Sequence, residues 1–295
     1  MTDNKRSFLP EVKIDVQIST KDLAPVAQDL IAKISRATGT FYQPWKIVRE
    51  AKAIRKAGEE LAGLSELGLT EIEMRAFQRV ISEGSKQQEN IERITLEATD
   101  ALEDNAKPDA VDDDWVADFF AKARHISDEE FSTLWSKILA GEANRPGSFS
   151  KRTLNIIYGL TKEDAELFRE LCRYVIMIGI PCPFIFHLDE ERYSLNFENL
   201  GHLQDLGLVN FNSVAGFVRQ GFPDDFLFNY GSVSMRAVKK PDSTANKNDI
   251  LMGHVMFTKS GLELFGLADA LMVPEFEQYV VKKISEGPYN ASIVT

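Results

Sequence analysis

Cysteine is scarce in this chain, which has 295 residues but only Cys172 and Cys182. Two thiols cannot build a disulfide framework or a four-thiolate metal site, so the sequence excludes a disulfide scaffold and favours a reducing compartment. The chain also lacks any apolar run close to the roughly 18–20 residues that cross a bilayer. Its first residues contain no apolar segment typical of a secretion signal. We therefore expect a cytoplasmic protein with no transmembrane segment.

Motifs of the common enzyme classes are missing as well. The sequence contains no His-Glu-x-x-His, no Gly-x-Ser-x-Gly and no glycine-rich phosphate loop. Its four histidines lie far apart, and His187 with the acidic residues 189–191 is more typical of a solvated turn than of a metal site. We therefore predict no catalytic residue, no metal and no cofactor. A hydrolase with a dispersed active site is an alternative that no spacing supports.

Negative charge outweighs positive charge, with 45 acidic residues against 34 basic ones and a net charge of −11. An acidic surface repels polyanions, which disfavours nucleic-acid binding over the whole surface. The apolar fraction of 44% and the charged fraction of 27% are those of an ordinary globular protein. At about 150 residues per domain, the length predicts two domains.

The order of the residue patterns predicts a mainly α protein, with a long-helix N-terminal half and a mixed α+β, winged-helix-like C-terminal half. Residues 1–102 are expected to form a helical oligomerisation region. Residues 103–114, EDNAKPDAVDDD, contain one proline and six acids and predict an acidic linker. A helical core block over residues 115–178 and an α+β region over residues 179–295 are expected to follow.

A long helix is predicted over residues 71–102, because Thr70 and Glu73 have the spacing of a capping box. One face of this helix carries its apolar side chains: Ile72, Ala76, Phe77, Val80 and Ile81. A lone amphipathic helix is marginal in water, so a second helix must cover this face. The cover can come from this chain or from a second copy. We favour a second copy and expect a homo-oligomer.

The core block contains a stripe with the spacing of a core-facing helix: Trp135, Ile138 and Leu139. A capping box at Ser127 and Glu130 is expected to open this helix, and Gly141 is expected to end it. Three polar residues in and after the helix are the ones that packing explains least: Glu142, Arg145 and Ser148. We expect them to cap the turn and pair locally. Contact with a ligand or a partner protein is the alternative.

Five basic residues lie at helical spacing after Pro44: Lys46, Arg49, Lys52, Arg55 and Lys56. A run of this modest length is usually a solvated face. Contact with nucleic acid or an anionic lipid surface is the alternative. In the winged-helix-like unit, residues 196–205 carry two acids and no Lys or Arg. This helix therefore lacks the basic side chains that contact DNA phosphates. A nucleic-acid-binding regulator is therefore our second hypothesis, after an interaction protein.

The string ISDEEFSTLWSKILAGEANRPGSFSKRTLNIIYGLTKEDAELF resembles an uncharacterised bacterial family catalogued as domain of unknown function 2806. The strings TGTFYQPWKIVREAKA, QENIERI and VDDDWVADFF are similar to earlier signatures of that family, in the same order. Looser similarity links the Leu134–Glu142 helix to proteins of bacterial abortive-infection systems. The similarity to abortive-infection proteins implies a role in phage defence and gives no mechanism. Together with the expected self-association, it makes a non-enzymatic bacterial interaction or effector protein, acting through homo-oligomer and protein contacts, our first hypothesis.

Overall fold

The computed structural model describes residues 24–38, 70–186, 195–241 and 248–294. The chain divides into two compact units, residues 1–148 (unit 1) and residues 149–295 (unit 2). Each unit has its own core, and we describe each by itself.

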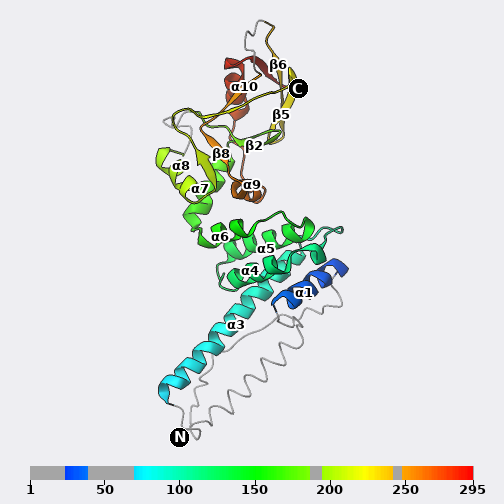
Figure 1. Ribbon diagram of the computed structural model, residues 1–295, viewed down its shortest axis with the longest axis vertical. Helices are drawn as coiled ribbons and strands as arrows, with labels where there is room; N and C mark the ends of the chain where they lie inside the picture. Colours follow the sequence, from blue (N-terminus) through cyan, green and yellow to red (C-terminus); the bar gives the residue numbers. More distant parts are fainter. Residues whose placement is uncertain (1–23, 39–69, 187–194, 242–247, 295) are drawn as a thin grey trace. The chain divides into compact units, whose positions relative to one another are not determined.

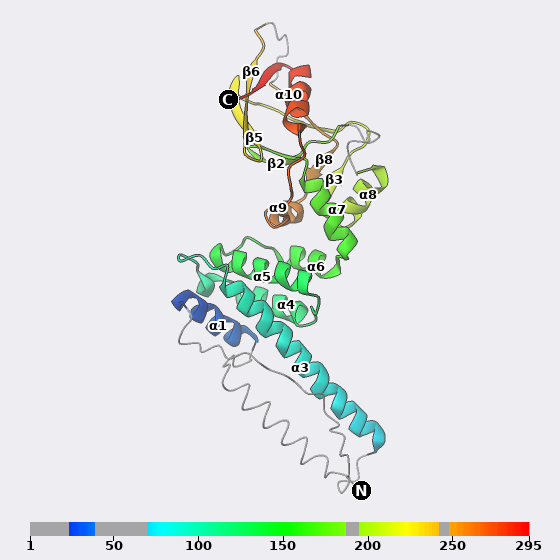
Figure 2. The same ribbon diagram turned by 180° about the vertical axis from the view of Figure 1, so that it is seen from behind.

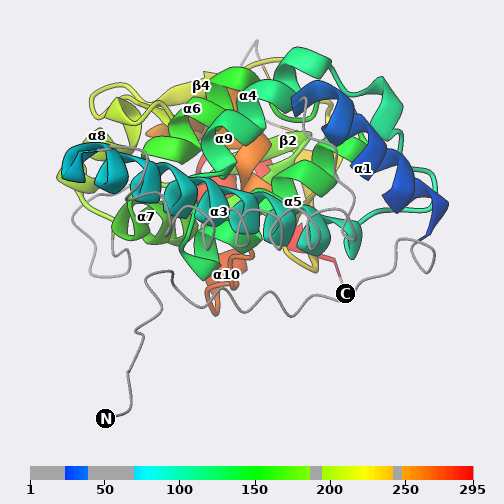
Figure 3. The same cartoon turned by 90° about the horizontal axis from the view of Figure 1, so that it is seen from below.

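In the described residues of unit 1, all regular secondary structure is helical. Its elements are α1 (Pro25–Thr38), α3 (Glu71–Thr99), the 3₁₀ turn η3 (Pro108–Ala110), α4 (Asp113–Ala123) and α5 (Glu129–Asn144). The C-terminal half of α3 packs against α1, α4 and α5, and its N-terminal half extends past these three helices (Figure 1 and Figure 2). Helices α1 and α4 lie on the same side of α3, as the view from below shows (Figure 3).

Aromatic side chains from α4 and α5 form the centre of this core. Trp135 is 0% exposed, which confirms the predicted face of α5. Its ring meets the edge of Phe119, with the centroids 5.0 Å apart, and Phe119 stacks on Trp115 at 5.2 Å. Ile138 and Leu139 are buried as expected.

The predicted ends of these helices are partly confirmed. The capping box of Thr70 and Glu73 opens α3 as expected. Helix α5 instead begins after Asp128, whose side chain accepts from the N–H groups of Glu130 and Phe131, so the predicted cap at Ser127 is wrong. Gly141 does not end α5, which continues to Asn144. Packing holds this last turn, because Ala140 and Ala143 on either side of the glycine are buried.

The acidic segment 103–114 is tied into unit 1 by specific contacts. Lys33 on α1, itself buried, forms an ion pair with Asp113 at 2.5 Å. Arg36 pairs with Asp109 at 2.6 Å. Pro108 is buried in the 3₁₀ turn. Opposite charge on α1 therefore holds the acids of this segment in place.

Unit 2 combines helices with antiparallel strands. Its helices are α6 (Lys151–Gly159), α7 (Lys162–Cys172), α8 (Phe197–Asp205), α9 (Lys259–Phe265) and α10 (Phe276–Glu286). Its strands are β1 (Val175–Ile178), β2 (Ile180–Pro183), β3 (Val209–Phe211), β4 (Phe217–Arg219), β5 (Asp225–Tyr230), β6 (Val233–Lys239), β7 (Ile250–Gly253), β8 (Val255–Phe257) and β9 (Tyr289–Ile293).

Five of these strands form one antiparallel sheet in the order β2-β1-β5-β6-β9, and β3–β8 and β4–β7 form two-stranded ribbons. The side chains of β5 and β6 alternate between the two faces. Phe228, Tyr230, Met235 and Ala237 are buried. Helix α10 packs against β6 and β9 (Figure 2).

This sheet overturns the predicted fold class. The chain is mixed α/β rather than mainly α with a winged-helix-like half, because a five-stranded antiparallel sheet organises unit 2. The strands are only three to seven residues long. In addition, β3 pairs with β8 from much later in the chain. Local sequence patterns therefore underestimated the strand content of unit 2.

Candidate functional site

The N-terminal half of α3 carries the most exposed large apolar side chains of the described part of unit 1. Ile72 is 68% exposed and Val80 is 63% exposed, and Ala76, midway between them, is exposed as well. Residues four apart lie on one face of a helix. Ile72, Ala76 and Val80 therefore form a continuous exposed apolar row, which we call the α3 stripe. The other described helices cover the opposite, C-terminal end, where Ile94 and Ala98 are buried.

Charged side chains border the α3 stripe. Glu73 accepts from the backbone N–H of Thr70 at 2.7 Å and from its hydroxyl at 2.8 Å. These hydrogen bonds lower the pKa of Glu73 and favour its charged form. Arg79 lies 3.8 Å from Glu83, one turn further along the same helix. All three charges are exposed, so they can meet a partner that covers the stripe.

Each of the three polar residues predicted at the end of α5 makes a contact within unit 1. Glu142 is buried, and its Oε1 accepts from the N–H of Gly147 at 2.6 Å. Arg145 pairs with Glu103 at 3.3 Å. The hydroxyl of Ser148 donates to the carbonyl of Arg145 at 2.6 Å. A ligand or partner contact at these residues stays a prediction.

The other predicted candidates lie outside the described residues. The basic residues Lys46, Arg49, Lys52, Arg55 and Lys56 fall within the undescribed range 39–69, and His187 begins the undescribed range 187–194. Polyanion binding through the basic run stays a prediction.

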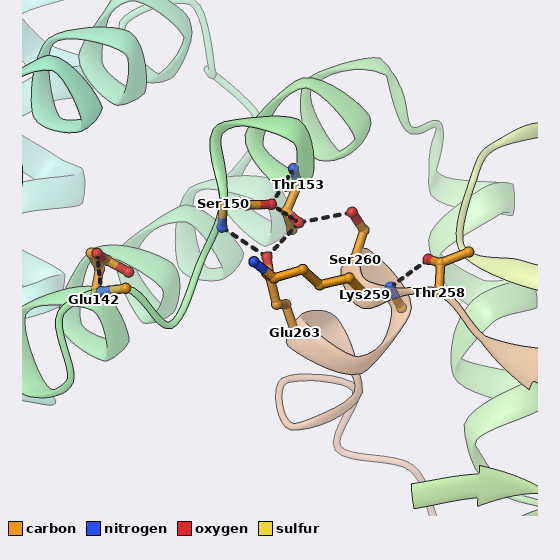
Figure 4. Close-up of polar contacts among 9 residues, drawn as sticks. Glu142, Ser150, Thr153, Thr258, Lys259, Ser260 and Glu263 are labelled. Atoms are coloured by element: carbon orange, nitrogen blue, oxygen red, sulfur yellow. Dashed lines mark hydrogen bonds and ion pairs between the residues drawn. The ribbon is translucent and has the colours of Figure 1, made fainter.

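A buried polar cluster in unit 2 joins the N-termini of α6 and α9 (Figure 4). The Glu263 side chain is only 8% exposed. Its Oε2 accepts from the backbone N–H of Ser150 at 2.8 Å and from the Thr153 hydroxyl at 2.5 Å. The Thr153 hydroxyl also lies 3.0 Å from Ser260 Oγ. The three side chains of Glu263, Thr153 and Ser260 thus form one hydrogen-bonded chain.

This arrangement completes a helix cap from a distant part of the sequence. In a capping box, the side chain three residues after the N-cap returns to the N-cap N–H. At α6 that residue is Thr153, whose side chain bonds Ser150 Oγ instead, and Glu263 of α9 supplies the carboxyl group that meets the Ser150 N–H. An acid is favourable there, because the N-terminus of a helix is electropositive.

The cluster is closed to solvent and joins two helices. Ser260 is 2% exposed and Thr153 is 0% exposed, so neither hydroxyl can reach a substrate from solvent. The remaining oxygen of Glu263 lies 3.6 Å from the Lys259 ammonium. These contacts fix α6 against α9.

None of the residues in this cluster was predicted from the sequence to form a site. Glu263 and Ser150 are 113 residues apart, and no local spacing connects them. The sequence does indicate the start of α9 through its N-cap residue, Thr258, whose side chain accepts from the Gly261 N–H at 3.1 Å. That signal locates the helix but not the partner of Glu263.

A histidine–carboxylate pair joins α7 to α8. His202 Nε2 lies 2.5 Å from Asp164 Oδ1, and the histidine nitrogen donates, because a carboxylate only accepts. Asp164 also closes a capping box with Thr161. Burial raises the pKa of Asp164, but the hydrogen bonds from His202 and Thr161 outweigh it, and the net shift is downward. The pair links two helices and is half open to solvent at the histidine.

Both cysteines are buried. Burial raises the pKa of Cys182 to about 12, against a smaller opposing effect of the Arg219 charge. Burial raises the pKa of Cys172 as well. Since the thiolate is the reactive form, both thiols are poorly nucleophilic near neutral pH.

Among the described residues, no group of three His, Cys, Asp or Glu side chains has the geometry of a metal site. No helix in this part of the chain combines the length and the apolar character needed to cross a bilayer.

No curated protein and no solved structure is similar to the chain at a significant level, and the similarity to abortive-infection proteins is not shown. A family model described as "Protein of unknown function (DUF2806)" matches residues 74–281. The match begins inside α3 and extends into α10, so it includes most of α3 and of the sheet of unit 2. The chain therefore belongs to the DUF2806 family.

Proposed function

We propose that this protein is a non-enzymatic interaction protein that works through self-association, with the α3 stripe as its contact surface. The observation that carries the proposal is the exposure of Ile72 and Val80, at 68% and 63%. Burying a large aliphatic side chain contributes about 1.5–3 kcal/mol. An exposed apolar row on a long helix is therefore a surface that gains from being covered.

The size of the stripe predicts the strength of the association. Two copies would bury two large side chains each, which contributes roughly 6–12 kcal/mol before any costs. Loss of translational and rotational freedom costs about 4–15 kcal/mol. The two ranges overlap, so we expect a weak, concentration-dependent dimer in solution rather than a permanent one.

Light scattering of the full chain over a wide concentration range tests the proposal. We expect the mass to rise from 33.2 kDa towards twice that value. Replacing Ile72 and Val80 together with Ser should hold the protein at the monomer mass. Val214, which is 93% exposed on unit 2, offers a matched control, because V214S removes an exposed apolar group away from α3. A constant monomer mass for the parent at high concentration would contradict the proposal.

A nucleic-acid-binding regulator has less support. Helix α8 carries Glu198 and Asp205 and no Lys or Arg, and phosphate contacts supply most of the non-specific affinity for DNA. The net charge of −11 also disfavours a polyanion partner. A protein partner suits the chemistry of the α3 stripe better.

The biological setting we propose is bacterial phage defence of the abortive-infection type. Its support is the resemblance of the α5 helix alone. Protection of host cells in a plaque assay, lost in the variant with Ser at positions 72 and 80, would support it. Equal plaque counts with and without the protein would count against it.

A further inference from the structure

Among the strands that the structure describes, β2 and β9 lie at the two ends of the five-stranded sheet of unit 2. An outermost strand presents backbone N–H and C=O groups with which a strand of another chain can pair. Proteins prevent this pairing with prolines, charges or a covering segment at the edge. The two edges of this sheet are closed in different ways.

Strand β2 has prolines at the positions that face away from the sheet. The Phe184 N–H donates to the Tyr174 carbonyl at 2.9 Å, in register with the ladder between β1 and β2. Successive residues of a strand direct their N–H groups to opposite sides, so Pro181 and Pro183 face away from β1. Because proline has no N–H group, neither position offers a donor to a further strand.

Strand β9 contains no proline. The Val294 N–H, just after the strand, donates to the Ser234 carbonyl of β6 at 2.8 Å. By the same alternation, Tyr289, Ala291 and Ile293 direct their N–H groups to the outer edge. Ala291 is the middle residue of the three, so a further strand aligned with β9 would pair with its N–H group.

The Ala291 N–H group already has an acceptor within the chain. It donates to the hydroxyl of Ser285, near the end of α10, at 3.0 Å. The Lys240 ammonium donates to the carbonyls of Ser285 and Gly287 at 2.7 and 2.8 Å. The Lys240 N–H also donates to the Pro288 carbonyl at 2.9 Å. These hydrogen bonds fix the last turn of α10 beside the outer edge of β9.

We infer that Ser285 keeps the outer edge of β9 closed to strand addition, and that loss of its hydroxyl lets β9 pair with β9 of a second copy. An antiparallel pair with Ala291 opposite Ala291 is two-fold symmetric, and each freed N–H meets the carbonyl of the other copy. This symmetry is why a second copy is the expected occupant. The inference concerns a different surface from the α3 stripe and does not depend on the proposed self-association.

Hydrogen exchange of the backbone amides tests the contact itself. We expect the Ala291 amide to exchange about fivefold faster in S285A, from the typical net contribution of one hydrogen bond. S285T keeps a hydroxyl and should match the parent, and S292A, which removes an exposed hydroxyl from the same strand, is the matched control. Unchanged exchange at Ala291 would contradict the contact. Faster exchange throughout unit 2 would assign Ser285 to stability alone and overturn the inference.

Light scattering tests the consequence for pairing. All variants also carry I72S and V80S, so that the α3 stripe does not contribute to the measured mass. We expect the mass of S285A to rise with concentration towards that of a dimer, and S285T to stay at the monomer mass. Adding A291P to S285A removes the freed N–H and should restore the monomer, because proline is tolerated where an N–H faces the outer edge of a sheet.

The outcomes separate this inference from the proposed function. An S285A variant that stays monomeric, although its Ala291 amide exchanges faster, would overturn closure by Ser285. An S285A variant that associates equally with and without A291P would place the contact elsewhere and also overturn the inference. Neither result bears on the α3 stripe, because its two large side chains are replaced in every variant of this series.

Discussion

Replacing Trp135 with Ala should strongly destabilise unit 1. The side chain is 0% exposed and meets the ring of Phe119 at 5.0 Å. Deleting a buried aromatic side chain costs about 3–5 kcal/mol in lost burial and residual cavity. Among the described residues, no group accepts a hydrogen bond from Trp135 Nε1. A buried N–H without a partner costs about 1–3 kcal/mol, and the substitution removes that penalty. We therefore expect a loss near the lower limit, about 3 kcal/mol.

The companion variant Trp135→Phe separates the two contributions. It removes the unpartnered N–H and keeps an aromatic ring beside Phe119, so we expect a loss of only about 1 kcal/mol. Urea unfolding of the full chain, followed by circular dichroism, measures both variants. Tyr158, which is 47% exposed on unit 2, gives a control, since Y158A should shift stability by less than about 0.5 kcal/mol. A Trp135→Ala curve that overlays the parent curve would refute the assigned core.

Two further predictions concern unit 2. Gly261→Ala should lower the free energy of unfolding by about 1–3 kcal/mol, because a methyl group there would clash with the carbonyl oxygen of Leu208. Gly266→Ala, where the added methyl group has open space, serves as the control in the same urea assay. Asp164 should make stability fall in acid: burial raises its pKa, but the hydrogen bonds from His202 and Thr161 hold the folded-state pKa below the ordinary 3.8. The stabilisation is therefore complete above the unfolded pKa and is lost as the pH falls through the lower, folded pKa. Asp164→Asn should flatten that acid-side decline in melting temperature, and an unchanged slope would show that Asp164 contributes nothing to it.

Local residue patterns predicted the parts of the fold that depend on near neighbours. The capping box at Thr70 is present as predicted, because a cap needs only side chains three residues apart. The stripe through Trp135 indicated a buried helical face for the same reason. The α3 stripe was visible as an apolar row, but its exposure depends on where the other helices of unit 1 lie.

Local patterns also misjudged positions where packing outweighs intrinsic preference. Asp128 and Ser127 are both good N-caps, and only the structure shows which one accepts the free N–H groups. Gly141 lowers helix propensity by about 1 kcal/mol, yet α5 continues because its neighbours are buried. In β5 and β6, apolar and polar side chains alternate with the period of two typical of a strand, but the sequence does not identify the strands with which they pair.

The sequence by itself determined the start of α3, the buried face of α5 and the net negative charge of the chain, since these follow from neighbouring residues and composition. Only the tertiary structure decided the order of the five strands in the sheet, the Glu263 cap on α6 and the ion pairs of the acidic segment with α1. Each of these joins residues far apart in the chain: Glu263 meets Ser150 across 113 positions. Such contacts depend on how whole elements pack, because a distant partner becomes favourable only after chain folding has overcome the entropy cost of bringing the two segments together.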